Sequence, residues 1–168
     1  VSLPGLPCVI IGHNDRIAWG VTNLEFDVQD IYFEKLDSST GRYLDSGRTA
    51  QARPEREVIR VKGSSPVEFV NWVTRHGPVF AVEGNQMLSL RWIAADTSVF
   101  RFPFLDLNRA RNWPEFKAAL SCLSVPSSNF VYADRDGNIG YQVAGKLPIR
   151  RGFAGDVPAD GSTGAYEW

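Results

Sequence analysis

The stretch that decides the fold is Cys8-Val9-Ile10-Ile11-Gly12-His13-Asn14-Asp15-Arg16-Ile17-Ala18-Trp19-Gly20-Val21. Two apolar runs, residues 8–11 and 17–21, flank a polar turn at Asn14-Asp15-Arg16, and this arrangement predicts a β-hairpin. The chain is therefore expected to begin with antiparallel strands.

Further strands are predicted along most of the chain. Alternating patterns predict strands at 30–36 and 56–62, and the β pattern continues over 67–74. Short apolar runs predict two more hairpins, one joining 79–82 to 87–93 around a turn at 83–85, and one joining 130–133 to 139–143 around Asp136-Gly137. Beyond Lys146 the chain is rich in Gly, Pro and Asp and is expected to be irregular.

One helix is clear. Asn112 is a favourable N-cap, Pro114 lies in the first turn, and Glu115 stands three residues after the cap, as in a capping box. Apolar residues then recur at helical spacing as far as Pro126, namely Trp113, Phe116, Leu120 and Leu123. The elements together predict an α+β fold, a mainly antiparallel β-sheet with one clear helix, in a single fragment of one domain over residues 1–168.

The composition excludes several classes of partner. The 168 residues carry a net charge of -1, whereas nucleic acid and anionic membrane surfaces attract a basic excess. No apolar run approaches the ~20 residues that a membrane helix needs. The two cysteines, Cys8 and Cys122, are too few for a disulfide framework or a zinc motif. Both ends of the sequence suggest a fragment of something larger.

Several strings of residues resemble the penicillin acylase (penicillin amidase) family, in family order and from end to end. They are Leu3-Pro4-Gly5-Leu6-Pro7, Ile10-Ile11-Gly12-His13-Asn14, Ile17-Ala18-Trp19-Gly20-Val21-Thr22-Asn23, Asp27-Val28-Gln29-Asp30-Ile31-Tyr32, Arg75-His76-Gly77-Pro78, Asn112-Trp113-Pro114-Glu115-Phe116 and Asn129-Phe130-Val131-Tyr132-Ala133-Asp134. The resemblance implies part of an αββα N-terminal-nucleophile hydrolase fold.

The resemblance also implies an activity. Family members are precursors that cut themselves into a small and a large subunit, and the new N-terminal serine of the large subunit attacks an amide with its own α-amine as base. This chain would be an internal piece of the large (beta) subunit of an N-acyl amide hydrolase. Its nucleophile would lie upstream of Val1, because Ser2 does not match that position. The isolated fragment is therefore expected to be inactive.

Two residues are candidates for catalysis. The resemblance makes Asn14 the asparagine that donates its side-chain N–H to the oxyanion of the tetrahedral intermediate. The alternative is that Asn14 only holds the turn that follows it. Lys35 stands where well-studied members carry an arginine near the active site, and it keeps the charge without the planar fork.

Four other polar residues have a structural interpretation beside a functional one. His13 is expected to bond nearby backbone, and His76 to be structural, because the family base is the α-amine. Asp27 is a possible calcium ligand, since several members bind Ca²⁺, which takes six to eight oxygens. Asp30 is expected to make caps or salt bridges instead.

The implied partners are the remaining parts of the precursor and a small N-acyl amide substrate, with no nucleic acid and no membrane. Penicillins, cephalosporins and acyl-homoserine lactones are all possible substrates, and a periplasmic or secreted location follows from the family alone. The alternative function is a non-catalytic β-rich binding module that kept the family fold.

Overall fold

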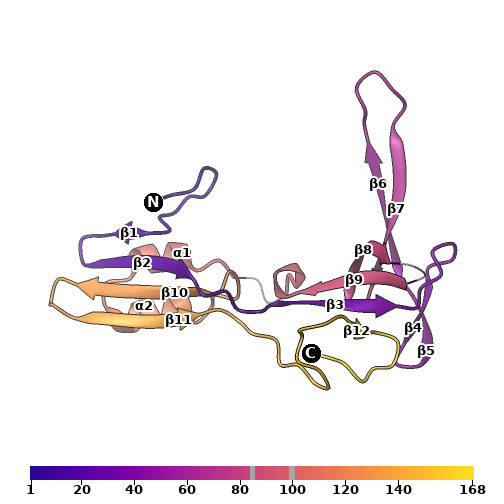
Figure 1. Cartoon of the computed structure of the whole chain (residues 1–168). Helices are drawn as coiled ribbons and strands as arrows, with labels where there is room; N and C mark the ends of the chain where they lie inside the picture. The colour runs from indigo at the N-terminus through magenta and orange to yellow at the C-terminus, as the bar shows by residue number, and fades with distance from the viewer. Residues whose placement is uncertain (84–85, 99–100) are drawn as a thin grey trace. The chain divides into compact units, whose positions relative to one another are not determined.

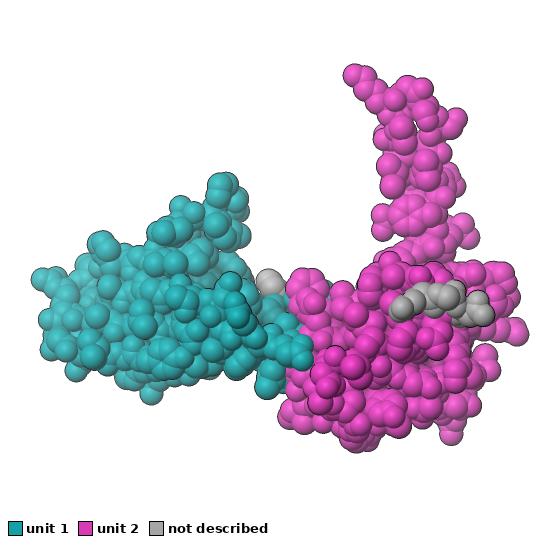
Figure 2. Space-filling view, in the orientation of Figure 1, with its two compact units in different colours: residues 1–28, 93–147 teal, residues 29–92, 148–168 magenta. Residues whose placement is uncertain are grey.

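The computed structural model describes residues 1–83, 86–98 and 101–168 (Figure 1). Its contacts divide the chain into two compact units, each made of two separate stretches (Figure 2). Unit 1 comprises residues 1–28 and 93–147, and unit 2 comprises residues 29–92 and 148–168. Each unit has its own sheet, so each is described by itself.

Unit 1 contains a four-stranded antiparallel sheet in the order β1-β2-β10-β11. The strands are β1 (Gly12–His13), β2 (Ile17–Asn23), β10 (Ser128–Asp134) and β11 (Ile139–Ala144). The predicted hairpin of β10 and β11 is confirmed, with Val131 opposite Tyr141.

The first hairpin forms, but its first strand begins later than the sequence predicts. Gly12 and His13 pair with β2, whereas residues 8–11 are not a strand. The reason is that the backbone N–H and C=O of Val9 bond the side chain of Asn108, at 2.7 Å each, and so do not join a ladder with β2.

Two helices cover one face of this sheet: α1 (Phe104–Arg109) and α2 (Trp113–Leu120) (Figure 1). The cap of α2 is as predicted, because Asn112 Oδ1 accepts from the backbone N–H of Glu115 at 3.0 Å. The Glu115 carboxylate accepts in turn from the N–H of Arg111. Helix α2 ends at Leu120, before Pro126, and α1 was not predicted.

The core of unit 1 lies between this sheet and the helices. Phe130 and Tyr132 of β10 pack against Phe116 of α2, and all three rings are buried. Residues of the opposite face of the same strands are exposed, including Val131, Ile139 and Tyr141. We call this uncovered side, made of alternate residues of β2, β10 and β11, the open face.

Unit 2 contains a six-stranded sheet in the order β12-β3-β9-β8-β7-β6. Its strands are β3 (Gln29–Glu34), β6 (Arg53–Ile59), β7 (Val67–Thr74), β8 (Gly77–Glu83), β9 (Gln86–Trp92) and β12 (Ala159–Asp160). All neighbours are antiparallel except β12 and β3. The β6–β7 hairpin projects from the rest of unit 2 (Figures 1 and 2).

The expected mainly antiparallel strands are thus present, with two α-helices among the described residues where one clear helix was expected. The strand expected at 56–62 is shifted to Arg53–Ile59, and a separate hairpin of β4 (Arg42–Asp45) and β5 (Arg48–Gln51) was not predicted. Of the predicted turn at 83–85, residues 84–85 lie outside the described residues. Within the described part of the chain, no helix has the length and apolarity needed to cross a membrane.

Candidate functional site

Asn14 joins the β1–β2 turn to the end of α1. Its Oδ1 accepts from the backbone N–H groups of Arg16 and Ile17, at 2.8 and 2.9 Å. Its Nδ2 donates to the carbonyl oxygens of Asn108 and Ala110, at 3.0 and 2.8 Å. Both amide hydrogens are therefore engaged, and the two carbonyls belong to the C-terminal end of α1, where helices leave such groups unpaired. The geometry gives Asn14 a turn-holding role in unit 1.

His13 lies beside this turn on the surface. Its Nδ1 is 3.1 Å from the carbonyl oxygen of Asn14, a contact with nearby backbone. A pocket of about 320 Å³ opens here, between the β1–β2 turn and the turn of β10 and β11. Asp134 holds the second turn by accepting from the backbone N–H groups of Asp136 and Asn138, which accounts for these residues without a metal.

A polar row crosses the otherwise mostly apolar open face at the end of β2. Asn129 of β10 donates through Nδ2 to Thr22 Oγ1 at 3.2 Å and to the carbonyl oxygen of Asn23 at 3.1 Å. The Tyr141 hydroxyl of β11 donates to Asn129 Oδ1. We call Thr22, Asn129 and Tyr141 the polar row. Its amide lies on the side of the sheet that no helix covers, unlike the amide of Asn14.

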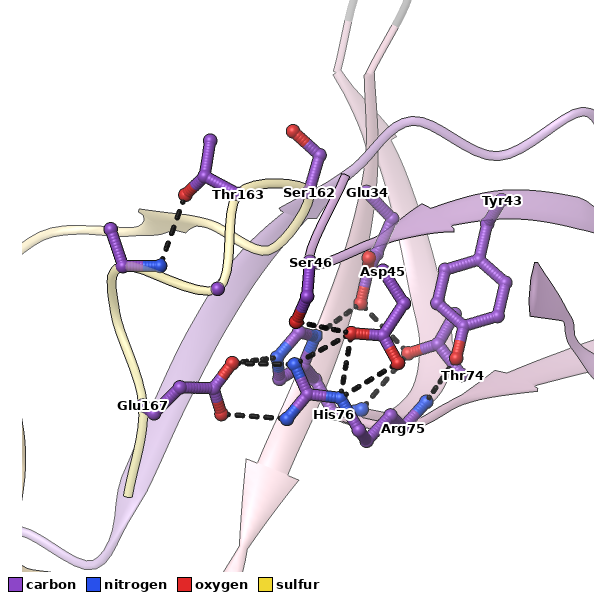
Figure 3. Close-up of polar contacts among 12 residues, drawn as sticks. Glu34, Tyr43, Asp45, Ser46, Thr74, Arg75, His76, Ser162, Thr163 and Glu167 are labelled. Carbon is purple, nitrogen blue, oxygen red and sulfur yellow. Dashed lines mark hydrogen bonds and ion pairs between the residues drawn. The ribbon is translucent and has the colours of Figure 1, made fainter. Parts of the chain in front are cut away.

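A buried polar cluster lies in unit 2 (Figure 3). Glu34 of β3 is buried, and its Oε1 accepts from Thr74 Oγ1 at 2.7 Å and Ser89 Oγ at 2.8 Å, and contacts His76 Nδ1 at 2.9 Å. Tyr32 stacks on the His76 ring at 3.9 Å between centroids. Because both hydroxyls donate to the carboxylate and neither to the histidine, the cluster lacks an activated nucleophile. His76 is structural here, as expected.

Arg75 links residues 148–168 to this part of unit 2 through its ion pair with Glu167. Its guanidinium contacts Asp45 on one side and Glu167 on the other, with Nη1 2.8 Å from Glu167 Oε2 (Figure 3). Burial alone would raise the pKa of Glu167, but the Arg75 guanidinium outweighs it and lowers that pKa to about 2. A pocket of about 390 Å³ adjoins the pair and is lined in part by Arg151 and Trp168.

The remaining predicted site residues lie apart from any such cluster. Lys35 is exposed in unit 2, with Nζ 3.8 Å from Asp160 Oδ2. Asp30 is buried, and its Oδ2 pairs with Arg150 Nε at 2.8 Å, the salt bridge expected of it. Asp27 is exposed in unit 1. No group of three His, Cys, Asp or Glu that would suit a metal occurs among residues 1–83, 86–98 and 101–168.

Calcium therefore fits this chain only as part of a larger ligand set. The ion takes six to eight oxygens, and Asp27 supplies one carboxylate. The buried Asp30 Oδ1 has no hydrogen-bond partner.

The polar row and the buried cluster were missed by the sequence reasoning. Asn129 was interpreted as part of a hairpin. Only its place next to Phe130, in a strand whose side chains alternate between the two faces, indicated that it faces away from the helices. The Glu34 cluster joins residues 42 and 55 positions apart, and no local pattern marks such partners.

Comparisons with known proteins agree over the whole chain. A family profile described as penicillin amidase matches residues 1–168. An acyl-homoserine lactone acylase QuiP of Pseudomonas putida is 35% identical over 174 residues, which cover 100% of this chain and 21% of that protein. A penicillin G acylase of Escherichia coli is 31% identical over 170 residues, covering 96% of this chain and 20% of that protein.

A solved structure is also similar. A thermostable penicillin G acylase from Alcaligenes faecalis superimposes with a TM-score of 0.88 at 35% identity, over 99% of this chain and 31% of that one. The chain thus spans about a fifth of the length of the curated relatives it matches.

Proposed function

The chain belongs to the penicillin amidase family, and on that premise we propose that its parent protein hydrolyses the amide bond between an acyl group and an amine. The observation that carries this proposal is the family match over residues 1–168, together with relatives named as acylases. Residues 1–168 then form part of the larger subunit of a self-cleaving precursor, as the family resemblance implies. Its serine nucleophile lies outside this chain, and the isolated chain is inactive.

The open face supports an αββα arrangement of the parent. Helices cover one face of the unit 1 sheet, while Val131, Ile139 and Tyr141 on the other are 55%, 87% and 58% exposed. An apolar sheet face of this kind is stable when a second layer covers it. Because the chain is about a fifth of its relatives' length, we propose that a second sheet from the remaining parent sequence packs here.

Chemistry on an amide needs a hydrogen-bond donor for the negative charge that develops on the carbonyl oxygen. Asn14 is the donor expected from the resemblance, but both of its amide hydrogens already bond carbonyls at 3.0 Å or less. Asn129 lies on the open face, and both of its amide hydrogens are bonded as well, at 3.1 and 3.2 Å. We propose Asn14 as the donor, as the family resemblance implies, and Asn129 as the alternative.

The remaining parts of the proposal rest on family membership. The substrate is a small N-acyl amide, and relatives named for penicillin G and for acyl-homoserine lactones make both classes candidates. Lys35, whose Nζ lies 3.8 Å from Asp160 Oδ2, is proposed as an active-site charge. Calcium binding by Asp27 and a periplasmic or secreted location complete the proposal.

The test begins with the full-length parent. Intact-mass spectrometry should find two subunits, the larger beginning at a serine upstream of Val1, and the purified parent should hydrolyse a panel of N-acyl amides. A single uncut and inactive chain would refute the proposal and favour the binding module.

The two asparagines are then compared in that active parent. Asn14→Ala should lower kcat per folded molecule by ~10²–10³-fold, the usual cost of one oxyanion donor. Asn129→Ala should leave kcat per folded molecule within a fewfold of wild type. The reverse pattern would assign the donor role to Asn129.

A further inference from the structure

The β6–β7 hairpin stands free of the rest of the unit 2 sheet over most of its length. Residue pairs join the two strands from Arg53 opposite Val73 to Ile59 opposite Val67. Strand β7 pairs with β8 through its last two residues, at the base of the hairpin. The remainder projects from unit 2 as a two-stranded ribbon (Figures 1 and 2). We call residues 56–70, the projecting part, the arm.

Both faces of the arm carry apolar side chains. Residues opposite each other in paired strands share a face, and successive residues alternate between faces. Val58 and Val70 therefore lie on one face, and Ile59, Val67 and Phe69 lie on the other. Each of these five side chains is at least 39% exposed. A layer that covered a single face of the arm would leave the apolar side chains of the other face in water.

An arm of this kind is not stable by itself. An isolated two-stranded hairpin is marginal in water, because it has no further element against which to pack an apolar face. The base of the hairpin is held within unit 2, where Trp72 Nε1 donates to the carbonyl oxygen of Ser38 at 3.1 Å. At the far end of the ladder, Ile59 and Val67 are 51% and 53% exposed. Removal of this apolar surface from water would stabilise the arm.

The occupant of this surface has to reach both faces. A second copy of the chain fails this requirement in a two-fold contact, because such a contact uses the same face of both copies and leaves the other face uncovered. The remaining sequence of the parent meets the requirement, since the chain spans 21% of the length of its Pseudomonas putida relative. Most of the parent is thus available to form layers on both sides of the arm.

We propose that the arm is an interaction surface that inserts into a cleft of the parent's remaining sequence, so that both of its apolar faces are covered. The proposal rests on the proposed function in one respect, the longer parent, and does not depend on amide hydrolysis. It concerns unit 2 and a projecting ribbon, and is independent of the layer proposed over the open face of unit 1. The inserted arm would tie unit 2 to the rest of the parent.

Hydrogen exchange of the full-length parent tests whether the arm is covered. In a monomeric parent, the ladder amides of residues 56–70 should exchange at least ~10²-fold slower than an unstructured peptide of the same sequence, whereas a free ribbon opens readily. Light scattering on the same sample reports the oligomeric state. Protection below this level would overturn the proposal. Protection that appears only when the parent self-associates would also overturn it, and would assign the arm to a second copy.

Two truncations in the parent ask whether each face is covered. Phe69→Ala should speed exchange of the arm by ~10²–10³-fold, as for a phenylalanine in a packed interior. Val58→Ala, on the opposite face, should speed it about tenfold. Ser65→Ala is the matched control, because Ser65 is an exposed residue of the turn that joins the two strands, and it should keep the wild-type rate.

The outcomes separate this proposal from the proposed function. An effect confined to one face, no effect on either face, or an equal rise in Ser65→Ala would each contradict insertion into a cleft. An active parent with an unprotected arm would refute the insertion and leave amide hydrolysis in place. A parent that protects the arm on both faces but hydrolyses no amide would support the insertion and refute the proposed function.

Discussion

Replacement of Glu34 by alanine tests the buried cluster of unit 2 most directly. The Glu34 carboxylate has no exposed side-chain surface, and three groups converge on its Oε1: the hydroxyls of Thr74 and Ser89 and the His76 ring nitrogen. Glu34→Ala would leave all three in the interior of unit 2 without their shared partner.

The expected cost follows from this geometry. One buried polar group left unpaired costs about 1–3 kcal/mol, and three such groups face Glu34 Oε1. Because the three groups share one acceptor and partly relax together, we expect ~3–5 kcal/mol rather than three full penalties. The loss should be local to unit 2, whose strands β3 and β9 carry Glu34 and Ser89.

Hydrogen exchange of the parent protein measures this local opening. Each 1.36 kcal/mol is a factor of ten, so amides in β3 and β9 should exchange roughly 10²–10⁴ times faster in Glu34→Ala. Ser89→Ala is the matched control, since it removes a single donor to the same carboxylate, and should give about tenfold. If Glu34→Ala exchanges no faster than Ser89→Ala, the carboxylate is not the centre of the cluster.

Three further outcomes are expected. Gly77→Ala should prevent folding of unit 2, because the new Cβ would lie 2.0 Å from the Leu90 carbonyl oxygen at a φ of +124°. Gly63→Ala, in open space at a φ of +80°, should lower the stability by only ~1 kcal/mol. Equal soluble yields and melting temperatures of the two variants would contradict this. Asn112→Ala should destabilise by ~1 kcal/mol through loss of the α2 cap, and a melting temperature equal to wild type would count against the cap. The pKa of Glu167 is lowered to about 2 from 4.5, so its pairing with Arg75 stabilises residues 148–168 above pH 4.5, and this stabilisation is lost as the pH falls towards 2. Hydrogen exchange of residues 148–168 should therefore rise across this pH window in wild type but not in Glu167→Gln. Equal exchange profiles would refute the role of the Arg75–Glu167 pair.

The local elements were predictable because their signals are local. The Asn112 cap, the Asp136-Gly137 hairpin and strand β7 each depend on residues close in sequence, and the structure confirms them. Helix α1 was missed because six residues are too few to show a helical period. The β4–β5 hairpin was missed as well, since its strands are only four residues each.

The candidate site was less predictable, for a different reason. Asn14 bonds carbonyls 94 and 96 positions away, and no pattern around Asn14 indicates that its amide is engaged. The same holds for Asn129, whose partners Thr22 and Asn23 lie 107 and 106 positions away. The family resemblance predicted Asn14 as the oxyanion donor, and that role stays a prediction.

The interleaving of the two units has a consequence for synthesis on the ribosome. Asp30 of unit 2 pairs with Arg150, 120 positions further along the chain. At ~5–20 residues per second, roughly 6–24 s separate the emergence of these two residues. During that interval β3 lacks its neighbour β12, while the second stretch of unit 1 is still being made. The nascent chain therefore exposes an unpaired strand edge for seconds, the period in which a chaperone would protect it best.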